Sequence, residues 1–133
     1  MRIATLYLVI ILLSSCSRSA TGKKLAGCDS LIITFNAPNS DSVINVVSTT
    51  ETKAISKLAG FVDGKPAEQY KCGYDGNMIF FKGGRQVLPV VFKYSEEGCR
   101  HFLFDLDNKV MSCQMSNEAA DFLKSLATGN NWY

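Results

Sequence analysis

The sequence predicts an α+β domain in which an antiparallel sheet of about six strands carries two helices packed on one face. Short β-branched runs, the turn signals that separate them, and two stretches with an apolar helical stripe support this prediction. The expected order of elements is ββαββββα. A chain of 133 residues has room for one such domain with a modest core.

Two strands and one helix are expected in the first half of the domain. Leu31 to Phe35 and Val43 to Val47 are rich in β-branched residues, and the polar, proline-containing stretch between them indicates a turn. Ser48-Thr49-Thr50-Glu51 has the spacing of a capping box, which predicts a helix from about Thr49 to Ala59. Because its apolar stripe is short, this helix must lie on the sheet to be stable.

A first hairpin is expected in the second half. Asn77 to Lys82 and Gln86 to Tyr94 flank Gly83-Gly84, a pair typical of tight hairpin turns. Pro89 has no N–H to donate to a neighbouring strand, so it must lie at an edge or a bulge.

A second hairpin and a final helix complete the expected domain. Arg100 to Leu106 and Lys109 to Met115 flank Asp107-Asn108, and a two-residue loop there fixes the register between them. Ser116 or Asn117 is expected to cap the last helix, which ends near Gly129. The expected facing pairs are Phe104 with Met111 and Phe102 with Cys113.

The first residues of the chain have the pattern of an export signal. Met1-Arg2 gives a short positive start, and Ile3 to Leu13 is an apolar run that only Thr5 interrupts with a clearly polar side chain. As a helix this run spans only about 16 Å, against about 30 Å for the hydrocarbon core of a bilayer. An uncleaved spanning helix is therefore disfavoured. Leu13-Ser14-Ser15-Cys16 then resembles the lipobox of bacterial lipoproteins.

This resemblance implies that residues 1–15 are a signal peptide that type II signal peptidase removes after Ser15. The thiol of Cys16 then takes a diacylglyceryl group, and its new amine is often acylated, typically with palmitate, which gives stable membrane anchoring. Ser17, where an aspartate would favour the inner membrane, implies the periplasmic face of the outer membrane of the cell envelope. An ordinary secretory signal, cut near Ser15-Cys16-Ser17 or Ser17-Arg18-Ser19, is the alternative.

Residues 16–27 are expected to form the lipidated cysteine and a flexible tether, because Ser17 to Gly27 hold little apolar material. Residues 28–133 are expected to form the globular domain. Without Arg2, 13 of the 14 basic residues remain against 12 acidic ones, which offers no broad positive face. We therefore expect no nucleic-acid partner. No oligomeric state follows from the sequence.

Four cysteines remain besides Cys16, an even number that in an exported chain predicts two disulfides with three possible pairings. Hairpin geometry favours Cys72 with Cys99, because one precedes Asn77 and the other follows Tyr94. This leaves Cys28 for Cys113, with a buried free thiol at Cys113 as the alternative.

No other group of residues predicts a catalytic or metal site. A zinc site from Cys72, Cys99, His101 and Cys113 lacks any C-x-x-C pair, and His101 is expected to be a solvated strand residue. Asp105-Leu106-Asp107-Asn108 lacks the glycine and distal glutamate of a calcium loop, and Glu96-Glu97 is expected to lie in a surface loop. We therefore name no catalytic residue, metal ligand or cofactor.

The leading interpretation is a non-enzymatic envelope lipoprotein that acts as a binding or interaction module, with an envelope protein as a possible partner. Tyr70-Lys71-Cys72, followed by Asp75-Gly76 and a strand, resembles the opening strand of membrane-bound lysozyme-inhibitor lipoproteins. That resemblance implies a small β-barrel that inhibits an envelope-attacking hydrolase, which is the first alternative. A small envelope hydrolase, the second alternative, would need two acidic side chains converging in a cleft. An accessory subunit of a membrane assembly would instead expose a contiguous apolar patch.

Overall fold

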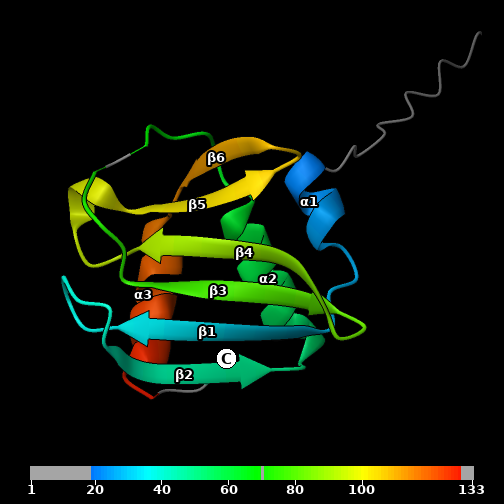
Figure 1. Ribbon diagram of the computed structural model, residues 1–133, viewed down its shortest axis with the longest axis horizontal. Helices are drawn as coiled ribbons and strands as arrows, with labels where there is room; N and C mark the ends of the chain where they lie inside the picture. Colours follow the sequence, from blue (N-terminus) through cyan, green and yellow to red (C-terminus); the bar gives the residue numbers. More distant parts are fainter. Residues whose placement is uncertain (1–18, 70, 130–133) are drawn as a thin grey trace, which may run out of the picture.

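The computed structural model describes residues 19–69 and 71–129 and shows one open antiparallel sheet of six strands in the order β2-β1-β3-β4-β5-β6. Both long helices lie behind the same face of this sheet (Figure 1), as expected. The signal peptide (1–15) and Cys16 lie outside the described residues. The strands are β1 (Ser30–Asn36), β2 (Val43–Thr49), β3 (Gly76–Lys82), β4 (Arg85–Lys93), β5 (His101–Leu106) and β6 (Lys109–Gln114). The helices are α1 (Ala20–Leu25), α2 (Thr52–Val62), the short 3-10 helix η1 (Glu97–Cys99) and α3 (Asn117–Ala127).

Strand β1 lies inside the sheet, between its hairpin partner β2 and the later strand β3. Its apolar residues Leu31, Ile33 and Phe35 alternate with polar or exposed ones and are fully buried against the helices. The long-range pairing of β1 with β3 therefore rests on a period-two apolar pattern, as expected for a sheet with one covered face.

Both predicted hairpin turns are confirmed. Gly83 and Gly84 have φ values of 57° and 77°, and Asp107 and Asn108 have 50° and 64°, which is the left-handed backbone of a tight two-residue turn. The predicted pairs Phe104 with Met111 and Phe102 with Cys113 are also present. The register of the β5–β6 hairpin thus follows from its turn, whereas the β3–β4 hairpin shifts its register between Phe80 and Phe81.

Pro89 occupies the edge position that its missing N–H requires. On one side it pairs with Ile79 of β3. On the other side β4 meets β5 only from Val91 to Lys93, so the part of β4 that contains Pro89 has no partner in β5.

Helix α2 begins later than predicted. Strand β2 continues to Thr49, which pairs with Leu31. The first two residues of the proposed capping box therefore belong to the strand and do not cap the helix. The residue before the helix is Glu51, whose side chain makes no capping hydrogen bond. The helix also continues beyond its predicted end at Ala59, to Val62, and buries Leu58 and Val62 in the core.

Helix α3 agrees with its prediction. The Ser116 hydroxyl accepts a hydrogen bond of 3.1 Å from the Ala119 amide, and Leu123 and Leu126 are fully buried. On the outer side of the helix pair the rings of Phe61 and Phe122 lie 6.0 Å apart. No helix within the described part of the chain is long and apolar enough to cross a membrane.

The prediction of a flexible tether over residues 16–27 is wrong from Ser19 onward. Ser19 caps helix α1, its hydroxyl accepting from the Gly22 amide at 3.0 Å and donating to Asp63 at 2.6 Å. Leu25 is 3% exposed and belongs to the core. Because a six-residue helix is unstable alone, its packing and its bond to Asp63 hold it on the domain.

Candidate functional site

The segment between α2 and β3 runs along one edge and one end of the sheet and is hydrogen-bonded to strand β6. Its first residues border β6: the Gln114 amide donates to the Lys65 carbonyl at 2.7 Å and the Ala67 amide to the Ser112 carbonyl at 2.8 Å. The Ser112 hydroxyl donates to the Glu68 carbonyl at 2.9 Å. The outer edge of β6 is therefore covered by the chain itself.

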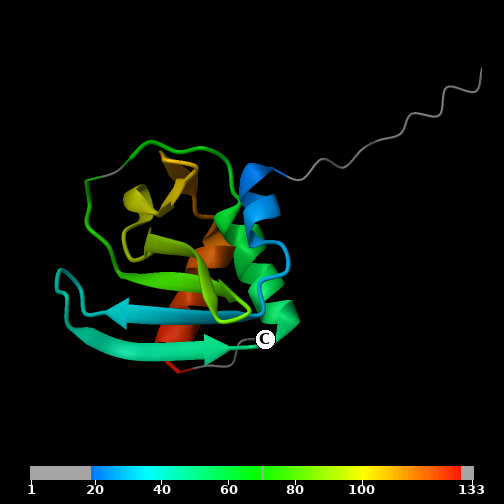
Figure 2. The same ribbon diagram turned by 45° about the vertical axis from the view of Figure 1, so that its right-hand side comes forward.

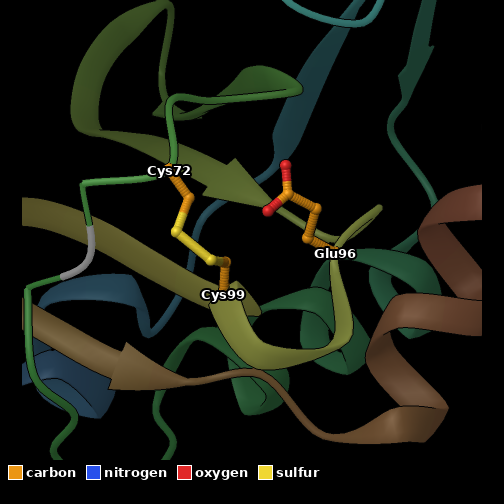
Figure 3. A group of neighbouring side chains, drawn as sticks. All are labelled: Cys72, Glu96 and Cys99. Atoms are coloured by element: carbon orange, nitrogen blue, oxygen red, sulfur yellow. A yellow bond between two sulfur atoms is a disulfide. The ribbon is translucent and has the colours of Figure 1, made fainter.

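A disulfide joins this segment to the loop after β4. Cys72 is bonded to Cys99, with the two Cα atoms 6.2 Å apart, which confirms the pairing predicted from the hairpin (Figure 3). The Glu96 carboxylate lies beside the bridge, within 4.8 Å of the sulfur atoms. Sulfurs bonded to each other are not the thiolates that a metal ion requires, so in this state the trio has one ordinary ligand, the carboxylate.

The predicted second disulfide between Cys28 and Cys113 is wrong, because both residues are free, buried thiols. They lie at opposite ends of the strands. Cys28 precedes Asp29, whose amide donates to the Phe81 carbonyl beside the β3–β4 turn. Cys113 pairs with Phe102, which in turn pairs with Phe92 near the other end of β4. Burial raises the pKa of both thiols, and a nearby carboxylate adds to the rise, so neither is a reactive thiolate.

His101 is fully buried, and the prediction that it is a solvated strand residue is wrong. By strand alternation its side chain points to the face opposite Phe102 and Phe104. That end of the outer face is covered by the α2–β3 segment, whose Tyr74 ring lies 6.1 Å from the imidazole. The Nδ1 atom lies 2.6 Å from the Cys99 carbonyl, which ties the histidine to the disulfide loop.

Asp75 is the centre of this region. Its side chain is 4% exposed and forms an ion pair of 3.2 Å with Lys93, which is 3% exposed. The other carboxylate oxygen accepts from the backbone amides of Tyr94 at 2.7 Å and Ser95 at 2.9 Å. The Ser95 hydroxyl donates to Oδ1 at 3.0 Å. Four donors therefore converge on one buried carboxylate.

The electrostatics keep Asp75 ionised. Burial alone would raise the pKa of this carboxyl group, but the hydrogen bonds from Tyr94, Ser95 and Lys93 outweigh it, and the pKa lies below its ordinary value. Burial and the charge of Asp75 raise the pKa of Tyr94, which keeps the phenol protonated. A carboxylate fixed in its charged form and fully bonded is suited to holding the loop after β4, not to exchanging protons with a substrate.

Gly76 explains why the motif is Asp75-Gly76. A Cβ atom at this position would overlap the Thr34 carbonyl oxygen of β1, so only glycine lets β1 and β3 approach next to the buried carboxylate. The sequence carries one signal of this buried ion pair, Lys93, a charged residue that ends the apolar strand β4.

The other acidic residues are dispersed. Glu96 has a side chain that is 56% exposed and lies 3.6 Å from Lys93, and Glu97 is exposed in η1. Three surface hollows hold one acidic residue each, Asp105, Glu51 and Asp41 respectively. None of these three hollows contains the pair of carboxylates that a glycoside hydrolase needs.

The face of the sheet away from the helices exposes apolar side chains. Ile32, Ile79 and Pro89 face one another across three neighbouring strands. Pro89 also borders a hollow of about 300 Å³ with Val91, Leu103 and Val110. The most exposed apolar side chains lie on the two outermost strands: Val43 at 58%, Ile44 at 57% and Val46 at 55% on β2, and Val110 at 53% on β6.

The chain matches no protein-family model, no curated protein and no solved structure to which it was compared.

Proposed function

We propose that this protein is a lipid-anchored, non-enzymatic binding module of a bacterial cell envelope, held at the membrane through Cys16. The observation that carries the proposal is the lipobox Leu13-Ser14-Ser15-Cys16, which is followed after only three residues by a folded helix. The partner we propose is an envelope protein with an exposed apolar surface.

The chemistry of the described residues supports a binding role. Asp75 and Lys93 neutralise each other inside the domain, Cys72 and Cys99 are bonded together, and Cys28 and Cys113 are buried with raised pKa values. These charged groups and cysteines are thus paired with one another or buried inside the domain. The apolar side chains on the outer face are exposed instead, and exposed apolar patches are typical of interaction sites.

The anchor is tested by Cys16→Ala in a lipoprotein-processing bacterial host. We expect wild-type protein in the membrane fraction, with acyl chains on its N-terminal peptide by mass spectrometry. The variant should be released or should keep its leader, because a lipobox without its cysteine cannot be lipidated. A membrane-bound variant cut at the same position would contradict the proposed anchor.

The binding role is tested by crosslinking the anchored protein in the envelope and comparing it with Ile32→Lys, which places a charge on the outer face of β1. We expect a crosslinked envelope protein that this variant loses, while Lys57→Ala on the opposite, helical side keeps it. Cleavage of purified peptidoglycan by the domain would instead establish a hydrolase. Stoichiometric loss of lysozyme activity would establish the inhibitor, although the open sheet differs from the barrel of that family.

A further inference from the structure

The two edges of the sheet are treated differently by the chain. Residues 65–67 border β6, with two backbone hydrogen bonds and a bridge between Pro66 and Cys113, so that edge is covered. Strand β2 forms the other edge, and within residues 19–69 and 71–129 its only strand partner is β1. Half of the backbone donors and acceptors of β2 therefore face away from the sheet.

Strand β2 also lacks charges and proline, two of the features that normally protect a sheet edge. Its seven residues, Val-Ile-Asn-Val-Val-Ser-Thr, contain no charged residue and no proline. Three of them, Val43, Ile44 and Val46, are more than half exposed. Edge strands usually avoid association through charges, proline or bulges, and a long apolar edge is a template for another strand. The one register shift in this hairpin lies at the turn end of β2, where Ile44 has no partner between Val43 and Asn45, so the strand is regular from Asn45 to Thr49.

We propose that β2 pairs with β2 of a second copy of this chain, antiparallel and around a two-fold axis perpendicular to the sheet. Such an interface is isologous, so the strand must be complementary to itself. An uncharged strand of β-branched and small polar residues meets this condition, because no like charges come to face each other. A charged edge would have excluded it.

The register follows from the symmetry. A perpendicular two-fold axis keeps the helices of both copies on the same side, so each outward residue must face an outward residue. The regular part of β2 runs from Asn45 to Thr49, and Val46 is its most exposed apolar residue. An axis at Val46 makes this residue face Val46 of the second copy. Asn45 then faces Val47, and both point to the helices, because they pair with Phe35 and Ile33 of β1. The two sheets become one continuous sheet with the exposed Val46 of each copy at the junction.

The position of β2 in the molecule leaves room for this pairing. Helix α1, which leads to the proposed anchor, lies on the β5–β6 side of the sheet, and β2 is the opposite edge in both views (Figures 1 and 2). A junction at β2 therefore does not approach the N-terminal end of either domain. A second copy is favoured over an extended peptide because an uncharged strand meets no like charge when it pairs with itself and offers no charge that would select another strand.

Sedimentation equilibrium of the chain without its first sixteen residues tests the proposal. From about 1 µM to about 500 µM we expect a reversible monomer–dimer equilibrium, as for other small interfaces. Val46→Lys and Val46→Glu should each weaken the dimer at least tenfold, because like charges then meet at the axis. An equimolar mixture of the two variants should regain it. Val110→Lys on β6, where the native side chain is equally exposed, is the matched control and should dimerise like wild type.

Circular dichroism and thermal unfolding check that each variant is folded. Because Val46 is exposed, substitutions at this position should leave the core intact. A monomer at every concentration would overturn the proposal, as would a dimer that both substitutions leave intact or a mixture that fails to associate. Trp132 is the only tryptophan. A monomeric wild type in which Val46→Lys shifts the tryptophan emission would also overturn it, by placing the C-terminal residues on this edge.

Discussion

Asp75 shows how one buried carboxylate can organise a loop. It accepts hydrogen bonds from the amides of Tyr94 and Ser95 and pairs with Lys93, which together fix the chain where it leaves β4. Glu96 and Cys99 follow directly, so the disulfide and the ion pair hold the same loop from two sides. Covalent and electrostatic links thus reinforce each other over a few residues.

Replacing Asp75 by asparagine should destabilise the domain strongly at neutral pH. The substitution leaves the buried Lys93 ammonium group with only the half-exposed Glu96 carboxylate, 3.6 Å away, as counter-charge, and breaking a buried ion pair typically costs about 3 to 5 kcal/mol of unfolding free energy. The double variant Asp75→Asn, Lys93→Met removes the orphaned charge and should recover much of this loss. Urea unfolding of the single and double variants measures the coupling. Additive effects of the two substitutions would show that the pair is not coupled.

The same carboxylate should make stability depend on acid pH. The pKa of Asp75 is lower in the folded chain than its ordinary value of about 3.9, so the unfolded chain binds the proton first. Its contribution is therefore complete above about pH 5 and is lost as pH falls through the folded pKa. Urea unfolding between about pH 5 and pH 2 should show a steeper loss for wild type than for Asp75→Asn. Parallel curves would mean that this carboxylate is not the group responsible.

The cysteines predict one bridge and two protected thiols. Intact mass under non-reducing conditions should lie two hydrogens below the fully reduced form, because only Cys72 and Cys99 are bonded. An alkylating reagent should modify Cys28 and Cys113 only after unfolding. Cys72→Ser with Cys99→Ser should lower the unfolding free energy by roughly 3 to 4 kcal/mol, given the sequence separation of 27 residues. A mass deficit of four hydrogens would show that a second disulfide, between Cys28 and Cys113, is present.

At the scale of elements, α1 was hidden in the sequence because it is made by tertiary contacts. Its residues Ala-Thr-Gly-Lys-Lys-Leu include a glycine and show no apolar stripe. Leu25→Ala should nevertheless cost about 2 to 4 kcal/mol of unfolding free energy, because a buried core side chain is removed. Lys24→Ala, an exposed neighbour in the same helix, should change it by less than about 0.5 kcal/mol. Equal, small effects would support a tether after all.

Local signals predicted the strands and turns well for a physical reason. Gly83-Gly84 and Asp107-Asn108 adopt a backbone that few other residues tolerate, so turn and register could be read together. Contacts between distant segments left no such local mark. The outward direction of His101 followed from alternation, but its burial depends on Tyr74, and the role of Asp75 depends on Lys93 in the adjacent strand. The candidate site was therefore missed, although its disulfide was predicted.

At the scale of the whole molecule, the position of α1 restricts how the domain can sit on a membrane. Two residues separate Cys16 from Ser19, the cap of α1, and even a fully extended chain over these three residue steps reaches only about 10 Å. This is shorter than the expected flexible tether of about 18 Å. If Cys16 is lipidated, the corner of the domain that carries α1 must therefore lie close to the headgroups. Lys23 and Lys24 are exposed there and can contact anionic lipids.

This orientation can be measured on lipidated protein reconstituted in vesicles. The native free thiols are buried, so a fluorophore can be placed selectively on Lys24→Cys in α1 or on Asp41→Cys in the β1–β2 turn. The turn lies at the end of the sheet away from α1 (Figure 1). A quencher attached to lipid headgroups should therefore quench the label at position 24 strongly and the label at position 41 weakly. Equal quenching would contradict this orientation, because it would place the β1–β2 turn as close to the headgroups as α1.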